Sequence, residues 1–512
     1  MTELSPWHYA LLVTHFTVCI ALAMYGVHRY QLVYLYYKYR RNMAQKQACF
    51  LVRPRVTVQL PMFNEQFVAR RVIENACKIK YPRDLIEIQV LDDSTDETVD
   101  IARQASDDMR AKGHNVVFIH RDNREGYKAG ALEHGLKTAT GDLVLIFDAD
   151  FIPPTDILDH LVDHFVDPKV GMVQARWEHI NRDQSLLTKT QAILLDGHFV
   201  IEHAARNWSG RFMSFNGTAG MWRKTCIADA GGWQHDTLTE DLDLSYRAQL
   251  KGWKFVYLQE VTSPAELPPE MNAFKSQQHR WAKGGAQTCR KLLPMILRSR
   301  LPWRIKTEAF FHLTGCVSYF LIMLLTIMLM PMLVLKTHLL GNNVPMRVLF
   351  DGSLILIATF SASSFYVCGQ REIFRTWSDS LKYLPFLMAL GAGVSINNAR
   401  AAFEGFFGKN SEFVRTPKFG SGGMDNQSWK GNAHKNRLDP KRVQAWCELF
   451  MAFYMVGCVA YTVQEKMWLG LFFMCLFTVG YFYVAMLTFY GRYQASRAAG
   501  AELVRPAVET IR

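Results

Sequence analysis

The chain has 512 residues, of which 49% are hydrophobic and 20% charged, and its formal net charge is +12. A chain of this length whose apolar residues gather in blocks is not a single soluble domain, so we expect membrane and polar parts. Many cations flank the apolar blocks, as the positive-inside rule predicts, which favours a lipid bilayer as partner and argues against nucleic acid. The ten cysteines are scattered singly, which predicts a reducing compartment and no zinc site.

The first element is an apolar run from Tyr9 to Val27, which is long enough to cross the hydrocarbon of a bilayer. Glu3 precedes it without any basic residue, and basic residues follow at 38–41. A secretory signal would begin with basic residues and end in a small-residue cleavage site, and neither occurs here. We therefore predict an uncleaved membrane anchor.

The polar region that follows has the rhythm of an open α/β sheet. Short runs rich in β-branched residues alternate with helical patterns, at 56–60, 86–91, 116–119, 143–147 and 170–173. Such mostly parallel sheets bind ligands beyond the carboxyl ends of their strands. Neither a G-x-G-x-x-G after the first strand nor a G-x-x-x-x-G-K-[ST] occurs, which excludes a dinucleotide cofactor and a P-loop.

Charged residues follow these predicted strands. Asp92 and Asp93 come after the second and could accept hydrogen bonds from a base or ribose, or could cap the next helix. Lys128, at the start of a predicted helix, could receive a diphosphate or simply be solvated. Asp148 and Asp150 end the fourth strand, where two carboxylates could meet Mg²⁺ or Mn²⁺ or form an ordinary solvated turn.

Two later motifs combine residues suited to sugar chemistry. Phe215-Asn-Gly-Thr-Ala-Gly-Met-Trp222 joins flexible glycines with aromatic rings that could stack on sugars or pack in the core. Thr239-Glu-Asp241 precedes a predicted helix, so that Asp241 could cap the helix or accept a proton from an attacking hydroxyl.

A Q-x-x-R-W motif, formed by Gln277, Arg280 and Trp281, stands before a basic stretch and the next apolar segment. A forked cation beside an aromatic ring could hold an anionic leaving group while stacking on a sugar face. Alone, the same residues also fit the end of an amphipathic helix.

Four further apolar stretches could span a membrane, at about 308–335, 348–368, 443–463 and 467–490. Residues 382–407 are apolar at first and then carry polar side chains and glycines. A full span there would export the basic segment 403–442, so we favour an interfacial or re-entrant element. The expected number of spans is therefore five or six.

These patterns predict a multi-pass protein of the plasma or inner membrane, or of the Golgi if the cell is eukaryotic. Positive-inside bias places the polar domain, segment 403–442 and the C-terminus in the cytoplasm. We expect an anchor and linker over 1–50, a cytoplasmic domain over 51–290, and interfacial helices with a transmembrane channel region over 291–512.

The ordered set of motifs resembles the processive inverting family 2 glycosyltransferases, which include cellulose and hyaluronan synthases. The likeness is closer to the cellulose-synthase-like A and C groups, the plant mannan and glucan synthases. It covers 55–290 closely and the later spans by layout. It rests on Gly126–Leu132, Phe147–Phe151, Gln174–Glu178, Phe215–Gly220, Ala230–Trp233 and Gln277–Trp281.

The resemblance implies a GT-A fold, a nucleotide-sugar donor, a Mg²⁺ or Mn²⁺ ion, and extrusion of a growing β-1,4-type polysaccharide. UDP-glucose and GDP-mannose users share these motifs, so both are candidate donors. The implied roles are catalysis by Asp241 with Glu240; donor binding by Asp92, Asp93, Lys128, Asp148, Arg280 and Gln277; acceptor binding by Trp281, Phe215, Asn216, Gly217 and Thr218; and metal binding by Asp148 and Asp150.

A looser likeness links Phe413–Lys418 to the gating segment of cellulose synthases, which implies a gating role for Arg415, Thr416 and Lys418. The chain departs from those synthases in having one predicted anchor before the domain and no PilZ module. Additional secretion subunits are possible partners, and the sequence does not identify them. Two other readings stay open. One is a membrane glycosyltransferase that makes a single transfer to a ceramide or polyprenyl phosphate lipid, and the other is a transporter or structural membrane protein.

Overall fold

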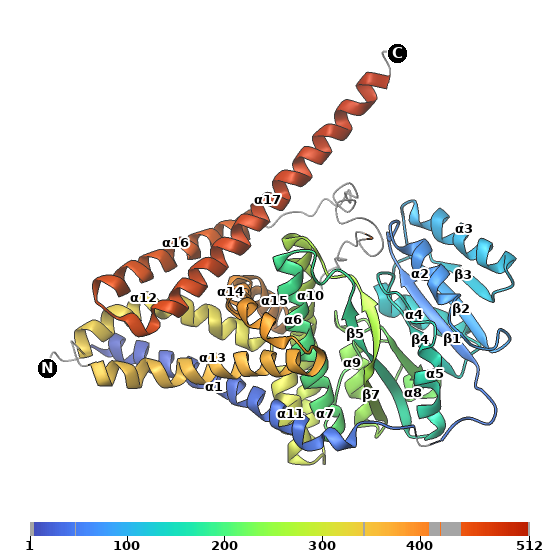
Figure 1. The fold of residues 1–512 in the computed structure, drawn as a ribbon, viewed down its shortest axis with the longest axis horizontal. Helices are drawn as coiled ribbons and strands as arrows, with labels where there is room; N and C mark the ends of the chain where they lie inside the picture. The colour runs from blue at the N-terminus through green and yellow to red at the C-terminus, as the bar shows by residue number, and fades with distance from the viewer. Residues whose placement is uncertain (1–4, 47, 341–343, 409–419, 421–441, 510–512) are drawn as a thin grey trace.

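The computed structural model describes residues 5–46, 48–340, 344–408, 420 and 442–509, with side chains left undescribed at 340, 344–358, 442, 469 and 495–509. Figure 1 shows a sheet domain beside a bundle of long helices. The predicted gating residues Arg415, Thr416 and Lys418 lie outside the described residues.

The domain is built on a seven-stranded sheet in the order β3-β2-β1-β4-β6-β5-β7. Strands β1 to β4 are parallel neighbours, whereas β6 runs antiparallel between β4 and β5. This confirms the predicted mostly parallel α/β sheet. The strand bounds are β1 Val56–Met62, β2 Ile86–Asp92, β3 Val116–His120, β4 Leu143–Ile146, β5 Val170–His179, β6 Gly220–Arg223 and β7 Lys254–Ala265.

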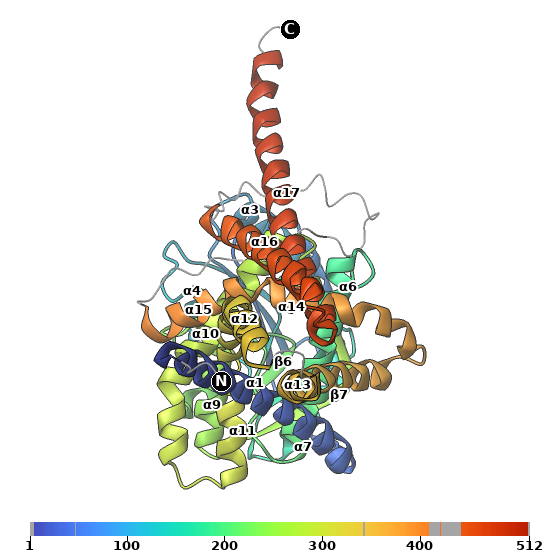
Figure 2. The same ribbon diagram turned by 90° about the vertical axis from the view of Figure 1, so that its left-hand side faces the viewer.

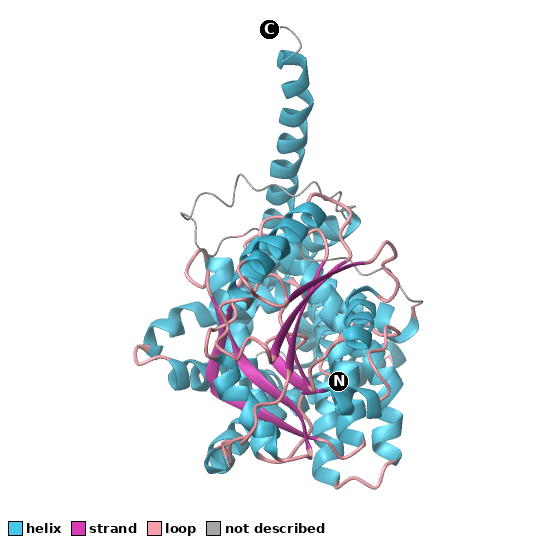
Figure 3. Ribbon diagram, turned by 90° about the vertical axis from the view of Figure 1, so that its right-hand side faces the viewer, coloured by secondary structure: helices cyan, strands magenta, loops and turns pink. Residues whose placement is uncertain are grey.

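Helices cover both faces of this sheet, as Figure 3 shows. Alternate residues of a strand point to opposite faces, so Leu145 packs in one core while its neighbours Val144 and Ile146 pack in the other. The helices on the first face are α2 Ala69–Ala76, α3 Thr98–Ala111 and α5 Ile157–Leu161. Those on the second include α4 Tyr127–Thr138, α7 Ala204–Trp208, α8 Lys224–Asp229 and α9 Glu240–Leu250.

Long helices form the remainder of the described chain, and Figure 2 shows several of them end-on. Among the described residues, four helices are long and apolar enough to cross a membrane, at Pro6–Asn42, Val317–Leu339, Val443–Gln464 and Leu471–Gln494. The chain is a membrane protein. The helix bounds are α1 Pro6–Tyr39, α10 Met271–Arg298, α11 Trp303–Leu313, α12 Val317–Leu340, α13 Val344–Ile373, α14 Leu384–Gly393, α15 Ser395–Phe407, α16 Arg442–Gln464 and α17 Leu471–Glu509.

The first helix docks the bundle onto the sheet domain. Tyr36 of α1 is fully buried, donates to Glu372 of α13 at 3.0 Å and accepts from Gln259 of β7 at 3.2 Å. Glu308 of α11 accepts from Arg206 of α7 at 2.9 Å. Because buried polar groups of this kind bond to specific partners, they fix how the long helices sit against the sheet.

Three predicted boundaries differ from the structure. The apolar stretch 308–335 is two helices, because α11 ends at Leu313 and α12 begins at Val317. The domain limit near 290 falls inside α10, which continues to Arg298. Segment 382–407 is divided at Val394 into α14 and α15, of 10 and 13 residues, and neither is long enough to span alone.

Candidate active site

Two carboxylates occupy the turn after β4, at the carboxyl edge of the sheet. The Asp148 amide donates to the Thr218 hydroxyl at 2.9 Å, which fixes the turn against the loop before β6. The Asp148 side chain is one-third exposed, and its Oδ1 accepts from Lys128 Nζ at 2.5 Å. Lys128 also donates to the carbonyl of Gly217 at 2.8 Å, so a single ammonium joins the strand-end turn to the glycine loop.

The Lys128 ammonium is electrostatically matched to this position. Burial acts to lower its pKa, but the carboxylates of Asp148 and Glu240 outweigh that effect and raise the pKa above its ordinary value. Lys128 therefore stays charged throughout the physiological pH range.

Asp241 lies in the first turn of α9, facing the same space. Its Oδ1 accepts from the amide of Leu242 at 2.8 Å. Burial, followed by repulsion from Glu240, raises the pKa of Asp241 to about 7, although Lys128 and Arg280 act in the opposite direction. A carboxylate with a pKa near neutrality can exchange a proton at working pH.

Helix α10 carries the Q-x-x-R-W residues along the pocket. Gln277, Arg280 and Trp281 line it, whereas Lys275 faces the other way and pairs with Glu448 of α16 at 2.6 Å. The absence of a side chain at Gly284 lets α10 approach the start of α9, since a Cβ there would lie 2.9 Å from the Thr239 backbone nitrogen. This close approach brings Arg280 near Asp241.

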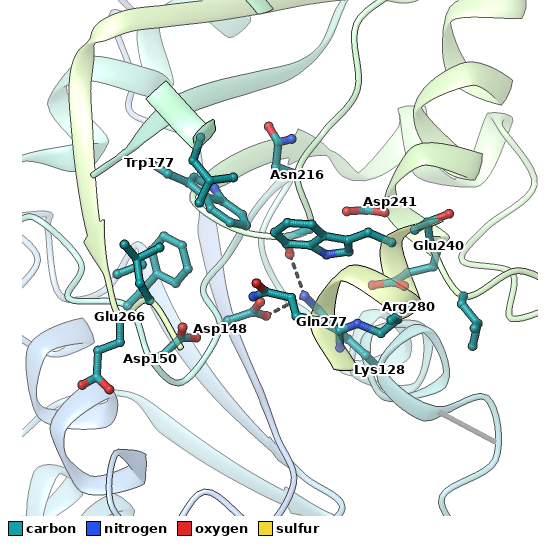
Figure 4. Close-up of a pocket in the computed structure, with 18 of the residues that line it drawn as sticks. Lys128, Asp148, Asp150, Trp177, Asn216, Glu240, Asp241, Glu266, Gln277 and Arg280 are labelled. Atoms are coloured by element: carbon teal, nitrogen blue, oxygen red, sulfur yellow. Dashed lines mark hydrogen bonds and ion pairs between the residues drawn. The ribbon is translucent and has the colours of Figure 1, made fainter. Parts of the chain in front are cut away.

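These elements enclose one pocket of about 760 Å³, its opening to solvent included, a size that suits a small ligand. Figure 4 shows Asp148, Gln277 and Lys128 meeting at its centre, with Glu240, Asp241 and Arg280 to one side. The predicted residues that line it are Lys128, Asp148, Asp150, Asn216, Gly217, Glu240, Asp241, Gln277, Arg280 and Trp281.

Four predicted residues are not among those that line the pocket. Phe215 is 1% exposed and packs edge-on against Trp222 at 5.6 Å, so its expected contact with the acceptor is corrected to a core role. Thr218 is fully buried and positions Asp148 instead of reaching a ligand.

Asp92 and Asp93 lie at the same sheet edge, beside β1. Asp92 is fully buried and accepts from His120 at 2.7 Å, so its predicted role in donor binding stays a prediction. Asp93 accepts two hydrogen bonds from Arg121, at 2.7 and 2.5 Å. Such a bidentate pair is rigid and charge-assisted.

The sequence did not mark several residues of the pocket wall. Phe151, Trp177, His179, Leu195 and Glu266 line it together with Leu238, Thr239, Ala265 and Leu267. Trp177 lies in the motif Gln174–Glu178, whose likeness to the family carried no role for the ring. Of the others, His179 on β5 and Ala265, Glu266 and Leu267 at or just after the end of β7 come together because β5 pairs with β7.

The pocket carboxylates Asp148 and Asp150 are candidate ligands for a divalent cation. No group of three or more His, Cys, Asp or Glu that could hold a metal occurs in the part of the chain that the structure describes. Mg²⁺ and Mn²⁺ sites in nucleotide enzymes commonly use one or two carboxylates and complete their shell with water and substrate phosphates. Asp148 and Asp150 fit a cation of that kind, bound together with a diphosphate.

The fold of the sheet domain has a counterpart among solved structures. A solved structure described as mannosyltransferase PcManGT from Pyrobaculum calidifontis, in complex with GDP-Man and Mn²⁺, has a TM-score of 0.51 to this chain at 20% identity. The likeness covers 77% of this chain and 99% of that one. The sheet domain therefore has the GT-A fold of glycosyltransferases.

The family follows from sequence. A model described as Glycosyltransferase like family 2 matches residues 54–284. Glucomannan 4-beta-mannosyltransferase 2 of Arabidopsis thaliana is 36% identical over 400 residues, which cover 76% of this chain and 71% of the relative. The chain belongs to the family 2 glycosyltransferases and is a hexosyltransferase, which confirms the resemblance seen in its motifs.

A second relative, glucomannan 4-beta-mannosyltransferase 9 of Arabidopsis thaliana, is 45% identical over 252 residues. That match covers 48% of this chain and 47% of the relative, so it spans about half of each.

Proposed function

We propose that the protein is a β-glycan synthase that transfers mannose from GDP-mannose to the non-reducing end of a β-1,4-linked chain. The site offers what such a transfer needs, namely cations for a diphosphate and an acid–base group for an acceptor hydroxyl. The names of the relatives, which are mannosyltransferases, favour mannose over glucose. The single observation that carries the proposal is the convergence of Lys128, Asp148, Asp241 and Arg280 on one pocket.

The donor's diphosphate would lie beside Lys128 and Arg280. Both side chains are cationic and line the pocket, so they stabilise the negative charge that develops on the departing nucleotide. Asp148 and Asp150 would hold a divalent cation, which when bound supplies further charge neutralisation at the diphosphate. Asp93, held rigidly by Arg121, would face the nucleoside beside the same sheet edge.

Asp241 would act as general base. Its raised pKa suits it to accept the proton of the acceptor hydroxyl as that oxygen attacks the anomeric carbon. Attack on the face opposite the leaving nucleotide inverts the configuration, so an α-linked donor gives a β-linked product. Glu240 beside it raises its basicity, and Gln277 would orient the donor.

Trp281 and Asn216 would receive the acceptor chain. An aromatic ring offers a flat apolar surface to a pyranose face, and an amide can hydrogen-bond its hydroxyls. Because α10 runs from this pocket to the turn before α11, the helices of the bundle stand where a growing chain could pass into the membrane. We propose that the chain is extruded there, with the catalytic domain in the cytoplasm.

The test compares donors and sizes the products. Purified full-length protein in lipid nanodiscs is incubated with labelled GDP-mannose or UDP-glucose, Mn²⁺ and a manno-oligosaccharide primer. We expect GDP-mannose to be consumed at least about tenfold faster and to yield products many residues long. Transfer of one sugar to lipid, with no polysaccharide, would instead support the lipid-acceptor reading. Absence of nucleotide release from either donor would contradict the proposed function.

A further inference from the structure

One wall of the pocket contains three polar side chains. Only one of them, Asn216, has a role in the proposed transfer. Trp177 and His179 lie at the end of β5, and Asn216 lies in the loop before β6. In Figure 4, Trp177 and Asn216 lie on the side of the pocket away from Lys128 and Asp150. They are therefore separated from the residues proposed to hold the diphosphate.

These side chains carry unsatisfied polar atoms. Trp177 Nε1, both ring nitrogens of His179 and Asn216 Oδ1 are buried, and none has a hydrogen-bond partner among the residues that the structure describes. The Asp196 carboxylate is 4.0 Å from His179 Nε2, which is too long for a hydrogen bond. Each buried polar group left without a partner costs about 1–3 kcal/mol, so three at one wall need an explanation.

Neighbouring side chains hold two of the three groups, Trp177 and Asn216. The Trp177 ring packs against Phe199 at 4.9 Å and edge-on against Phe151 at 5.3 Å. The Asn216 amide nitrogen is turned toward His198 Nε2, at 3.5 Å, which leaves the carbonyl oxygen for another partner. These contacts therefore orient Trp177 and Asn216 in this conformation.

Together the three side chains offer hydrogen-bond donors and acceptors that can recognise a hydroxyl group. Burial lowers the pKa of His179 to about 4, so the ring is neutral and offers one donor and one acceptor. The indole N–H can only donate, and the amide oxygen can only accept. A sugar hydroxyl donates and accepts at once, so a pyranose ring with neighbouring hydroxyls matches all three groups.

We propose that Trp177, His179 and Asn216 form a hydroxyl-recognition site for a pyranose unit of the acceptor chain. This inference rests on the proposed function and adds the residues that select the acceptor. The acceptor is favoured over the donor because Trp177 and Asn216 lie across the pocket from Lys128 and Asp150. The polar atoms are buried in this conformation, so side chains of the pocket wall have to move before a sugar can reach them.

The test uses substitutions that remove polar atoms and keep an aromatic ring. Trp177→Phe deletes the indole N–H, and His179→Phe deletes both ring nitrogens. Trp208→Phe is the matched control, because Trp208 Nε1 is also buried without a partner but belongs to the core outside the pocket. All three variants, made in the full chain, should fold, which a thermal-unfolding scan checks.

Initial rates are measured with GDP-mannose and manno-oligosaccharides of varied length, and with analogues lacking one hydroxyl. Each pocket variant should raise the KM for the acceptor about tenfold, the loss expected for one hydrogen bond, with the KM for GDP-mannose within about twofold. The unmodified chain should discriminate against one deoxy acceptor, and His179→Phe should lose that discrimination. Trp208→Phe should change neither constant.

An unchanged acceptor KM in both folded pocket variants would overturn the inference and leave the proposed function standing. A rise in the KM for GDP-mannose instead would also overturn it, because the set would then face the donor. If His179→Phe does not fold, Trp177→Phe decides alone. Failure of the unmodified chain to elongate any oligosaccharide would overturn the proposed function and this inference with it.

Discussion

At the scale of the residue, the proposed transfer depends on the ionisation of Asp241. As a base it must be unprotonated, and its pKa is raised to about 7 by burial and by Glu240. We predict that kcat/KM falls about tenfold per pH unit below pH 7 and levels off above it. Initial rates of GDP release between pH 5.5 and 8.5 measure this, and a flat profile would contradict the assignment.

The same pKa has a consequence for stability. The pKa in the fold lies above the value of about 3.9 in an unfolded chain, so folding favours the protonated form. The contribution of Asp241 to the free energy of unfolding is therefore fully present below about pH 4 and is lost as the pH rises through 7. Asp241→Asn should abolish synthesis and yet unfold at an equal or higher temperature than the unmodified chain at pH 8. A lowered unfolding temperature would show that the carboxylate is structural.

We predict that the lack of a side chain at Gly217 is needed to keep Asp241 and Lys128 in position. Its φ is +78°, and a Cβ would lie 3.1 Å from Asp241 Oδ2 and 3.3 Å from Lys128 Nζ. Gly217→Ala should cost about 1–2 kcal/mol of stability through its backbone and lower kcat at least tenfold by displacing Asp241. Gly210→Ala is the matched control, since φ is +69° there with no atom within 4 Å of a Cβ. Equal activity of the two variants would exclude the spacing role.

The individual residues show how far sequence could predict the site. Lys128, Asp148, Asp241 and the Q-x-x-R-W side chains lie within named motifs, and the structure brings them together. Phe215 could not be assigned correctly, because an aromatic ring next to glycines reads equally as a sugar platform and as core. Whether such a ring faces the pocket is decided by the packing of Trp222, a tertiary contact.

At the scale of the element, α10 connects the pocket to the bundle. Lys275 and Glu448 form a buried ion pair between α10 and α16, with Nζ–O distances of 2.6 and 2.8 Å. Gln444 also donates to Glu448, at 3.1 Å. This network holds the face of α10 opposite to Gln277 and Trp281, and thereby fixes the rotation of the helix.

We predict that Lys275→Met destabilises the protein by about 3–5 kcal/mol, because it leaves Glu448 buried without its counter-ion. The double variant Lys275→Met with Glu448→Leu should regain most of that stability, since a well-packed apolar pair often replaces a buried ion pair without loss. Thermal unfolding in nanodiscs measures both. If the double variant were as unstable as the single one, the pair would not be the source of the effect.

The strands differ in how well the local sequence pattern predicts them. The predicted runs match β1 to β5. Strand β4 is buried throughout and reads as a continuous apolar stretch, whereas β1 and β2 carry polar residues at alternate positions and are recognised by their β-branched residues. Strand β6 has four residues that follow a glycine loop, which is too short for any periodicity to appear. Strand β7 pairs with β5, far away in sequence, and that pairing builds the wall containing Trp177 and His179.

At the scale of the whole molecule, the bundle sets the topology. Cys49 is exposed in the linker after α1, and Gln464 is exposed at the end of α16. We propose that α12, α13 and α16 cross the membrane and that 382–407 returns to its own side, an arrangement in which these positions lie on opposite sides of the membrane. A span at 382–407 would put them on the same side.

We therefore predict that an impermeant maleimide added outside intact cells labels Gln464→Cys and does not label Cys49. The experiment uses single-cysteine variants, and permeabilised cells give the labelling maximum for each. Labelling of both or of neither in intact cells would contradict the proposed topology and favour a further span.

Inverting transfer through Asp241 is tested by the linkage of the product. Purified protein is given labelled GDP-mannose and a primer, and the product is digested with an endo-β-1,4-mannanase. The account predicts an alkali-insoluble or high-mass product that this enzyme degrades to short oligosaccharides, and no product from Asp241→Asn. A product that resists the enzyme but yields to an α-mannosidase, or one formed equally by Asp241→Asn, would contradict inverting transfer through Asp241.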